Sequence, residues 1–377
     1  MNRILSLIVL IIGFQTAFSQ VQVNAVSERI GFKKKDYTLS DYLTNNPFLN
    51  QKVDSIFNSL DDTSKVAQLI MPAIGKYGQS EETIYKLVNK RLIGGLLLLN
   101  GTKDQFSTWV KTINSTNTKV GALPFLYSAD AEPSLVNRKI VGSTSVKKAN
   151  EITSIEEVKE VATTISNDLN AIGINYNFAP VLDLSTNATV GYRGFGKDPA
   201  NITPWSNEFI HVTQSKNIIA TAKHFPGHGL VSGDTHKSLQ VIDGELKEVT
   251  YYPPSIEAGV LSIMVGHLAV KNNPQFNTNG MPATTSLKIV TELLRDSLNF
   301  KGLIVTDAMN MGGVVNVGNA NVLAIAAGCD ILLMPLDAEK AHQEILQKYK
   351  SDEEFKKQVE LAAKRVIRSK ICLGLIP

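Results

Sequence analysis

Residues 218–229 of the chain read Ile218-Ile219-Ala220-Thr221-Ala222-Lys223-His224-Phe225-Pro226-Gly227-His228-Gly229. The first five form an apolar, β-branched run that predicts a buried strand ending before Lys223. Pro226 and the glycines that follow it oppose a helix. The segment is therefore predicted to be a strand that ends in a polar loop. In a repeated βα protein, active-site groups collect at such strand ends.

Strand-like runs of this kind recur along the chain, with amphipathic segments between them. Residues 155–172, 286–298 and 351–369 place apolar side chains at three- and four-residue spacing and are predicted helices. Eight such units favour an α/β fold in which a parallel sheet closes into a (β/α)8 TIM-type barrel; an open doubly wound sheet is the alternative. The predicted strands are residues 68–72, 95–99, 124–128, 176–179, 218–222, 262–266, 303–306 and 331–334.

The N-terminus has the pattern of an export signal: a charged start, an apolar run and a small-residue cleavage site before Gln20. We expect residues 1–19 to be a signal peptide, residues 20–59 a helical extension and residues 60–377 a single catalytic barrel domain. The apolar run is shorter than the roughly 18 residues a membrane helix needs, although an uncleaved anchor is the alternative. The expectation is an exported protein, periplasmic or extracellular, without stable membrane insertion.

Charge and cysteine content limit the classes of molecule that the chain is expected to bind. The chain has 38 basic and 35 acidic residues and a formal net charge of +3, so it offers no basic field for nucleic acid. Its two cysteines, Cys329 and Cys372, are too few for a disulfide framework and lack metal-ligand spacing. Partners must therefore be inferred from polar residues at the predicted strand ends.

Such residues follow most of the predicted strands, and in a barrel these ends converge on one face. They are Asp130 and Glu132 after the third strand, Asp183 after the fourth, Lys223 and His224 after the fifth, His267 after the sixth and Asp307 after the seventh.

Several motifs together carry a family resemblance. The motif at 223–229 is followed four residues later by Asp234-Thr235-His236, and this chain resembles glycoside hydrolase family 3, most closely its bacterial β-N-acetylglucosaminidase branch. Further matches fall in order between about Leu60 and about Leu375. They are Asn177-Phe178-Ala179-Pro180-Val181-Leu182-Asp183, Arg193-Gly194-Phe195-Gly196, Met264-Val265-Gly266-His267 and Gly302-Leu303-Ile304-Val305-Thr306-Asp307-Ala308-Met309. The resemblance also implies that residues before Leu60 form helices packed across the barrel.

Glycosidic cleavage needs an anionic group near the anomeric carbon and a proton donor for the departing oxygen. The resemblance implies that Asp307, at the end of an apolar strand, is the nucleophile; an aspartate that caps the next helix is the alternative. It also implies that His236 is the general acid/base and that Asp234 orients it. An imidazole, with an ordinary pKa of about 6.5, both donates and accepts protons near neutral pH. The loop before this pair, residues 230–233, is expected to be mobile, so that His236 reaches the substrate when the loop closes.

Sugar hydroxyls need charged groups that donate and accept hydrogen bonds. In the family, the matching positions bind the sugar on the non-reducing side of the cut. They are Asp130, Arg138, Arg193, Lys223 and His224. Positive charge on Arg193 and Lys223 is also expected to keep Asp307 ionised. His228 and His267 are expected to be structural hydrogen-bond partners.

One loop departs from the family pattern. Where relatives have Asp-x-Glu-Gly-Gly before an arginine, this chain has Asp130-Ala131-Glu132-Pro133-Ser134 before Arg138. Proline fixes φ and removes a backbone donor, so the loop must follow a different path. The departure affects the expected shape of the outer pocket and the preference for a particular leaving-group sugar. The sugar-binding role that the resemblance implies is therefore a weaker expectation for Arg138 than for Arg193.

The predicted function is a retaining exo-β-N-acetylglucosaminidase, without metal or organic cofactor, that cleaves peptidoglycan-derived or chitin-derived saccharides as a monomer. The alternatives are a β-N-acetylglucosaminide phosphorylase, a β-glucosidase and a non-catalytic sugar-binding barrel. The glucosidase branch takes its acid from a second domain, for which we expect this chain to be too short. A zinc site at His224 and His228 would need a helix, which Pro226 opposes, and a Schiff base at Lys223 would need a desolvated, neutral lysine.

Overall fold

The computed structural model describes residues 37–184, 186–187, 189–196 and 198–377. The predicted signal peptide and most of the predicted N-terminal extension, up to residue 36, lie outside the described residues. Residues 38–377 form one compact unit. In this part of the chain no helix combines the length and the apolar character that a membrane crossing requires.

The strands are β1 (Ile70–Met71), β2 (Ala73–Ile74), β3 (Gly95–Leu98), β4 (Gly101–Thr102), β5 (Leu126–Ala129), β6 (Ile140–Val141), β7 (Tyr176–Asn177), β8 (Ile219–Phe225), β9 (Gln240–Asp243), β10 (Ser262–Val265), β11 (Leu268–Lys271), β12 (Leu303–Thr306) and β13 (Leu332–Leu333). The α-helices are α2 (Pro47–Ser59), α3 (Asp62–Ala67), α4 (Glu81–Asn89), α5 (Lys103–Lys119), α6 (Val136–Lys139), α7 (Ile155–Ile172), α8 (Pro199–Ser215), α9 (Tyr252–Glu257), α10 (Ala320–Ala327), α11 (Ala338–Ser351) and α12 (Glu353–Cys372). The 3-10 helices are η1 (Leu39–Asp41), η2 (Ala149–Glu151), η3 (Lys247–Tyr251) and η4 (Ala283–Thr285), and η5 (Lys288–Ser297) is a π-helix.

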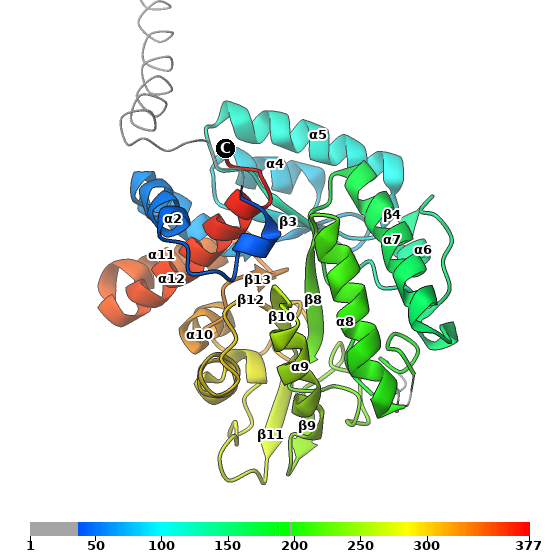
Figure 1. Cartoon of the computed structure of the whole chain (residues 1–377). Coiled ribbons are helices and arrows are strands. Elements are labelled where there is room, and N and C mark those ends of the chain that lie inside the picture. Colours follow the sequence, from blue (N-terminus) through cyan, green and yellow to red (C-terminus); the bar gives the residue numbers. More distant parts are fainter. Residues whose placement is uncertain (1–36, 185, 188, 197) are drawn as a thin grey trace, which may run out of the picture. The chain divides into compact units, whose positions relative to one another are not determined.

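Parallel strands form the central sheet, in the order β2-β3-β5-β7-β8-β10-β12. This order follows the chain without a reversal, which is the winding of a barrel rather than of a doubly wound sheet. Figure 1 shows the strands in the interior with α5, α7, α8 and α10 outside them. The fold is therefore α/β and TIM-barrel-like, as predicted at that level.

The prediction of eight strands in one closed ladder differs from the observed sheet. Proline lacks the N–H that a ladder needs, and Pro72, the last residue of the first predicted strand, separates β1 from β2, which lies beyond the predicted bounds. β2 ends the seven-stranded sheet, whereas β1 pairs with β13 in a separate two-stranded sheet. An isolated bridge between Val305 and Ile331 links β12 to the residue before β13. The continuous sheet therefore contains seven strands.

Local sequence signals explain α7, whose predicted bounds the structure confirms. The side chain of Ser154 accepts a hydrogen bond from the Glu157 N–H at 3.3 Å, which caps the first turn. Gly173 ends the helix in the left-handed conformation, with φ at 95°. Its predicted apolar face is buried, and the helix packs against α5 and α8. The helix predicted at 286–298 is the π-helix η5, and the one at 351–369 corresponds to α12.

β8 is longer than predicted, because the strand continues through Lys223 to Phe225. Successive residues of a regular strand point to opposite faces. Here Met264 of β10 pairs with Lys223 and the next residue, Val265, pairs with Phe225, so His224 is an extra residue in the ladder. Such a bulge re-aims side chains. It accounts for two consecutive residues, Lys223 and His224, lining the same cavity.

Residues 38–59 pack on the C-terminal helix. α2 lies against α12, and the Arg368 guanidinium of α12 donates to the Asp41 and Thr44 carbonyl oxygens at 3.1 and 2.6 Å. The same side chain donates to the Tyr42 carbonyl at 2.5 Å. The helical character expected for this segment is thus present in η1 and α2.

Candidate active site

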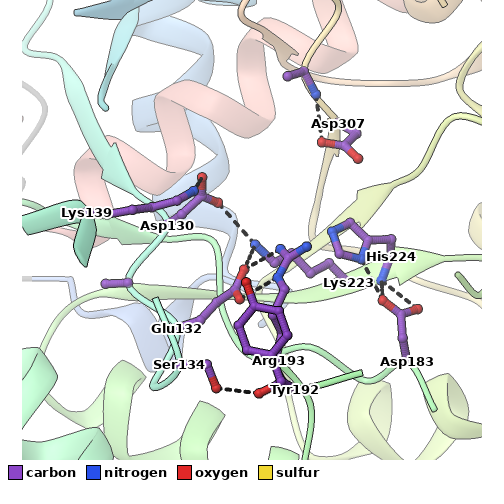
Figure 2. A network of polar contacts seen from close by, with 12 residues as sticks. Asp130, Glu132, Ser134, Lys139, Asp183, Tyr192, Arg193, Lys223, His224 and Asp307 are labelled. Carbon is purple, nitrogen blue, oxygen red and sulfur yellow. Dashed lines mark hydrogen bonds and ion pairs between the residues drawn. The ribbon is translucent and has the colours of Figure 1, made fainter. Parts of the chain in front are cut away.

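A cavity of about 620 Å³ lies at the carboxyl ends of the central strands. All eight predicted catalytic and substrate-binding residues line it. They are Asp130, Arg138, Arg193, Lys223, His224, Asp234, His236 and Asp307. Figure 2 shows Asp130, Arg193, Lys223, His224 and Asp307, whose side chains come from distant parts of the chain.

Asp307 directly follows β12 and is partly exposed at the cavity wall. Its backbone N–H donates to the Val265 carbonyl at 2.9 Å, and one carboxylate oxygen accepts from the Ala308 N–H at 2.8 Å. Burial opposes ionisation, but the neighbouring His224 and His267 and the Ala308 N–H outweigh it and lower the pKa of Asp307 to about 2. The group is therefore a carboxylate at neutral pH, as a nucleophile requires.

The predicted reason for that ionisation is only partly correct. Arg193 and Lys223 direct their charge to other carboxylates, whereas the histidines beside Asp307 make the larger favourable contribution to its low pKa. Sequence reasoning grouped these cations with Asp307 because strand ends converge. It could not resolve which of three carboxylates each cation contacts.

Asp234 and His236 form a pair at the rim of the cavity. The His236 ring nitrogen Nδ1 lies 2.7 Å from an Asp234 carboxylate oxygen, which also accepts from the His236 backbone N–H at 3.0 Å. Although burial acts in the other direction, these hydrogen bonds lower the pKa of Asp234. A carboxylate at this place holds the proton on Nδ1 and leaves Nε2 for exchange with a substrate oxygen. The His236 side chain is 61% exposed, so Nε2 can meet a ligand.

A second carboxylate, Asp183, orients the β8 motif. It lies 2.6 Å from His224 Nδ1 and accepts the His228 backbone N–H at 2.8 Å. Burial opposes its ionisation, but His224 outweighs that effect and lowers the pKa of Asp183. His224 thus has a fixed ring orientation, with Nε2 free of this contact. The sequence placed Asp183 at a strand end but assigned it no role.

Glu132 and Lys139 are further charged residues, and neither was assigned a role in the site from the sequence. Fully buried Glu132 binds the Arg193 guanidinium through two hydrogen bonds of 2.8 and 2.6 Å and the Lys223 ammonium at 2.5 Å. Asp130 binds Lys139 at 2.6 Å and Lys223 at 3.1 Å. Figure 2 shows this network (Asp130, Glu132, Lys139, Arg193 and Lys223), and all of its residues except Glu132 line the cavity.

Burial favours the neutral acid at both carboxyls of this network, but the cations outweigh it. They hold the pKa of Glu132 at about 2 and the pKa of Asp130 far below its usual range. Burial likewise opposes the charge on Lys223, yet Asp130 and Glu132 raise the pKa of its ammonium. A charged lysine cannot attack a carbonyl, which argues against the Schiff-base alternative.

Ser134, in the loop that departs from the family pattern, joins two other loops. Its hydroxyl donates to the Tyr192 carbonyl at 2.5 Å and accepts the Ala149 N–H at 2.9 Å. This contact fixes the backbone directly before Arg193. Arg138 also lines the cavity, but it is exposed and forms no ion pair with the residues the structure describes. Arg138 is therefore held less firmly than Arg193, which is paired with Glu132.

Buried groups outside the prediction hold the site loops in place. Glu248 accepts backbone N–H groups of Leu184 at 2.7 Å, Gly229 at 3.0 Å and Leu230 at 3.2 Å. Burial and the nearby Asp183 charge raise the pKa of Glu248 to about 7. No motif marks this residue, because it lies in a polar segment that resembles any surface turn.

The other histidines contact protein atoms, as expected for structural residues. His228 Nε2 lies 3.0 Å from the Thr235 hydroxyl, and His267 lies 2.9 Å from both the Thr284 hydroxyl and the Ala308 carbonyl. Within residues 37–377, apart from the three undescribed positions, no cluster of three His, Cys, Asp or Glu side chains could hold a metal ion.

The chain is similar to known glycoside hydrolases in sequence. The model of the glycosyl hydrolase family 3 N-terminal domain matches residues 61–369. A β-N-acetylglucosaminidase/β-glucosidase of Cellulomonas fimi is 28% identical over 337 residues, 84% of this chain and 58% of that protein. A β-hexosaminidase of Glaesserella parasuis is 30% identical over 266 residues, 66% of this chain and 75% of that protein.

Solved structures of proteins with such names also resemble this chain in fold. The β-N-acetylhexosaminidase of Beutenbergia cavernae superposes with a TM-score of 0.75 at 27% identity, over 83% of this chain and 99% of that one. The family 3 β-N-acetylglucosaminidase of Paenibacillus sp. FPU-7 gives a TM-score of 0.75 at 26% identity, over 84% and 63%. This chain spans 58% and 47% of the lengths of its relatives from Cellulomonas fimi and Pseudoalteromonas piscicida.

Proposed function

Because the chain belongs to glycosyl hydrolase family 3, we propose that it is a retaining exo-β-N-acetylglucosaminidase. The observation that carries the proposal is the Asp234–His236 pair, 2.7 Å apart, at the rim of the cavity that Asp307 also lines. An ionised carboxylate and a proton-transferring imidazole are the two groups that double displacement needs. The relatives named β-N-acetylglucosaminidase and β-hexosaminidase support the acetylated sugar as substrate.

In the first step, an Asp307 carboxylate oxygen forms a bond to the anomeric carbon while the bond from that carbon to the leaving oxygen breaks. The electron pair goes to the leaving oxygen, which takes the proton from His236 Nε2. Asp234 stays ionised and stabilises the imidazolium before transfer. The products are a glycosyl-enzyme on Asp307 and a free alcohol.

In the second step, water replaces the alcohol. His236, now neutral, removes a proton from the water as its oxygen bonds to the anomeric carbon, and the bond to Asp307 breaks. The carboxylate is restored and His236 regains its proton. Two inversions at the anomeric carbon give net retention.

The charged residues that line the cavity would bind the sugar ring. Lys223 offers donors, His224 offers a ring nitrogen, Asp130 offers carboxylate oxygens and Arg193 is held by Glu132. We further propose that the substrates are peptidoglycan-derived or chitin-derived saccharides and that the protein is exported. We also propose that the sheet closes into an eight-stranded barrel, with β13 as the strand that joins its two ends. Hydrogen bonds from Thr306 to Ile331 at 3.0 Å and from Leu332 to Leu69 at 2.7 Å support the closure.

The experiment compares nitrophenol release from the β-N-acetylglucosaminide and the β-glucoside, each with and without phosphate. We expect preference for the acetylated sugar, free N-acetylglucosamine as product and no phosphate requirement. Asp307→Ala should abolish turnover, whereas turnover at the wild-type rate would refute the nucleophile. A glycosyl phosphate product would favour the phosphorylase instead. Preference for the glucoside would favour the second activity in the name of the Cellulomonas fimi relative.

A further inference from the structure

The loop that follows the proposed nucleophile also contacts the loop that carries the proposed acid/base. Two successive N–H groups, of Gly312 and Gly313, donate to the carbonyl oxygens of His236 and Thr235, each at 3.0 Å. These bonds hold the backbone of His236 itself, and not a distant part of its loop. The geometry points to Gly312 as a positioning residue for the acid/base, an inference that rests on the proposed role of His236.

The close approach depends on the absence of a side chain. A Cβ built on Gly312 would meet the Lys237 carbonyl carbon at 2.5 Å and the His236 carbonyl oxygen at 2.9 Å. Cβ atoms essentially never approach backbone this closely, so an alanine would push the His236 segment away. The φ of Gly312 lies outside the left-handed range, and alanine adopts such backbone without strain. The effect of Gly312→Ala would therefore be steric contact with that segment.

Hydrogen bonds also hold residues 308–311, which connect Asp307 to Gly312. The Met309 N–H donates to the Leu333 carbonyl at 2.8 Å, the Met311 N–H donates to the Ala308 carbonyl at 3.0 Å, and His267 donates to that same carbonyl at 2.9 Å. The turn at 312–313 is thus tied to β13 and to the end of β12. Asp307 and His236 rest on one framework, which would set the distance between them.

Other bonds hold the acid/base loop from its far side. His228 Nε2 lies 3.0 Å from the Thr235 hydroxyl, and the Asn187 side chain donates to the carbonyls of Val231 and Gly233. The sequence suggested a mobile loop that closes on substrate. In this structure hydrogen bonds hold the loop at both ends, and the Gly312 N–H bonds to the backbone carbonyl of the proposed acid/base itself.

The test measures kcat/KM, which reports the steps up to the glycosyl-enzyme, for two aryl β-N-acetylglucosaminides. The dinitrophenyl glycoside expels a leaving group that needs no proton, and the phenyl glycoside needs one. We expect Gly312→Ala to lose about 10- to 100-fold on the phenyl glycoside, within the range of general acid catalysis, and less than about threefold on the dinitrophenyl glycoside. Gly318→Ala is the matched control, because its Cβ meets nothing within 4 Å, and it should leave both rates unchanged.

His236→Ala is the reference variant, and it separates this inference from the proposed function. If His236→Ala discriminates between the substrates and Gly312→Ala does not, the positioning role is wrong and the acid/base stands. If His236→Ala loses equally on both, the acid/base assignment fails and takes the inference with it. An equal loss of Gly312→Ala on both substrates would mean that the nucleophile moved, which also overturns the inference.

A second readout does not depend on activity. Amide hydrogen exchange in a peptide covering residues 230–240 should accelerate in Gly312→Ala and not in Gly318→Ala, since the lost bonds hold that segment. Unchanged exchange would contradict the docking. Should Gly312→Ala fail to fold, Gly313→Ala is the milder variant, because its Cβ lies 2.9 Å from the His267 Cβ and 3.2 Å from the Thr235 carbonyl oxygen.

Discussion

Replacing Glu132 by glutamine removes one charge from the buried network and keeps the size of the side chain. Its carboxylate is fully buried and binds two cations, Arg193 and Lys223, whose side chains are 10% and 1% exposed. Glutamine has one oxygen to offer and presents an NH2 group to a cation. The variant therefore removes the carboxylate partner of buried Arg193 and leaves Lys223 with Asp130 alone.

Two routes give similar magnitudes for Glu132→Gln. Breaking a buried ion pair by removing one partner costs about 3–5 kcal/mol. Lowering a carboxyl pKa from its ordinary value to about 2 corresponds to roughly 3 kcal/mol of stabilisation. We therefore expect the variant to lose about 3–4 kcal/mol of unfolding free energy at pH 7.

The pH dependence follows from the direction of the shift. The folded pKa of Glu132 lies below the unfolded value of 4.5, so its stabilisation is complete above that value and is lost as pH falls toward about 2. The difference between wild type and Glu132→Gln should thus shrink between pH 5 and pH 3.

The assay is urea denaturation of both proteins at pH 7, 5, 4 and 3. Glu353→Gln is the control: its side chain is 80% exposed and 3.7 Å from Lys356, and an exposed pair contributes less than about 1 kcal/mol. A Glu132→Gln effect below about 1 kcal/mol at pH 7, or one that stays constant down to pH 3, would refute the reasoning.

Three further outcomes are expected. Lys139→Met, which removes the 2.6 Å partner of Asp130, should raise KM for the acetylglucosaminide several-fold and leave kcat within about twofold in steady-state kinetics, because the sugar-binding carboxylate loses its fixed orientation. Ser134→Ala should cost about 1 kcal/mol in thermal unfolding, through loss of the bond to the Tyr192 carbonyl; an unchanged Tm would contradict the joining role. Burial lowers the pKa of Lys370 to about 7, so between pH 7 and 10.5 the folded state binds fewer protons than the unfolded state. Wild-type stability should therefore rise relative to Lys370→Met by up to a few kcal/mol between pH 7 and 9.5 in urea titrations, and a constant difference would mean that burial does not lower the pKa of Lys370.

Local patterns predicted most elements of the fold. The bounds of α7 follow from the Ser154 cap, the apolar spacing and Gly173, all within one segment. The run that forms β12 and the position of Asp307 at its end were equally visible. The first strand was predicted to end at Pro72, and β2 was missed, although the apolar residues Ala73 and Ile74 directly follow that proline.

The candidate site was predictable as a set of residues and not as a set of contacts. All eight predicted residues line one cavity because parallel strands carry their carboxyl ends to one face. Their pairing was not predictable. Lys223 binds Glu132 across 91 positions of sequence, a distance over which periodicity and propensity carry no information. Glu248 gave no sequence signal at all.

By itself, the sequence determined the type and order of the βα units, the family and the identity of the polar groups at the strand ends. Tertiary structure alone decided which carboxylate neutralises which cation, how a bulge at His224 aims two neighbours into one cavity, and that Gly312 contacts the His236 backbone. The physical reason is range. Helix capping and side-chain periodicity act within a few residues, whereas charge pairing and close backbone contact depend on distances that exist only after the strands have assembled.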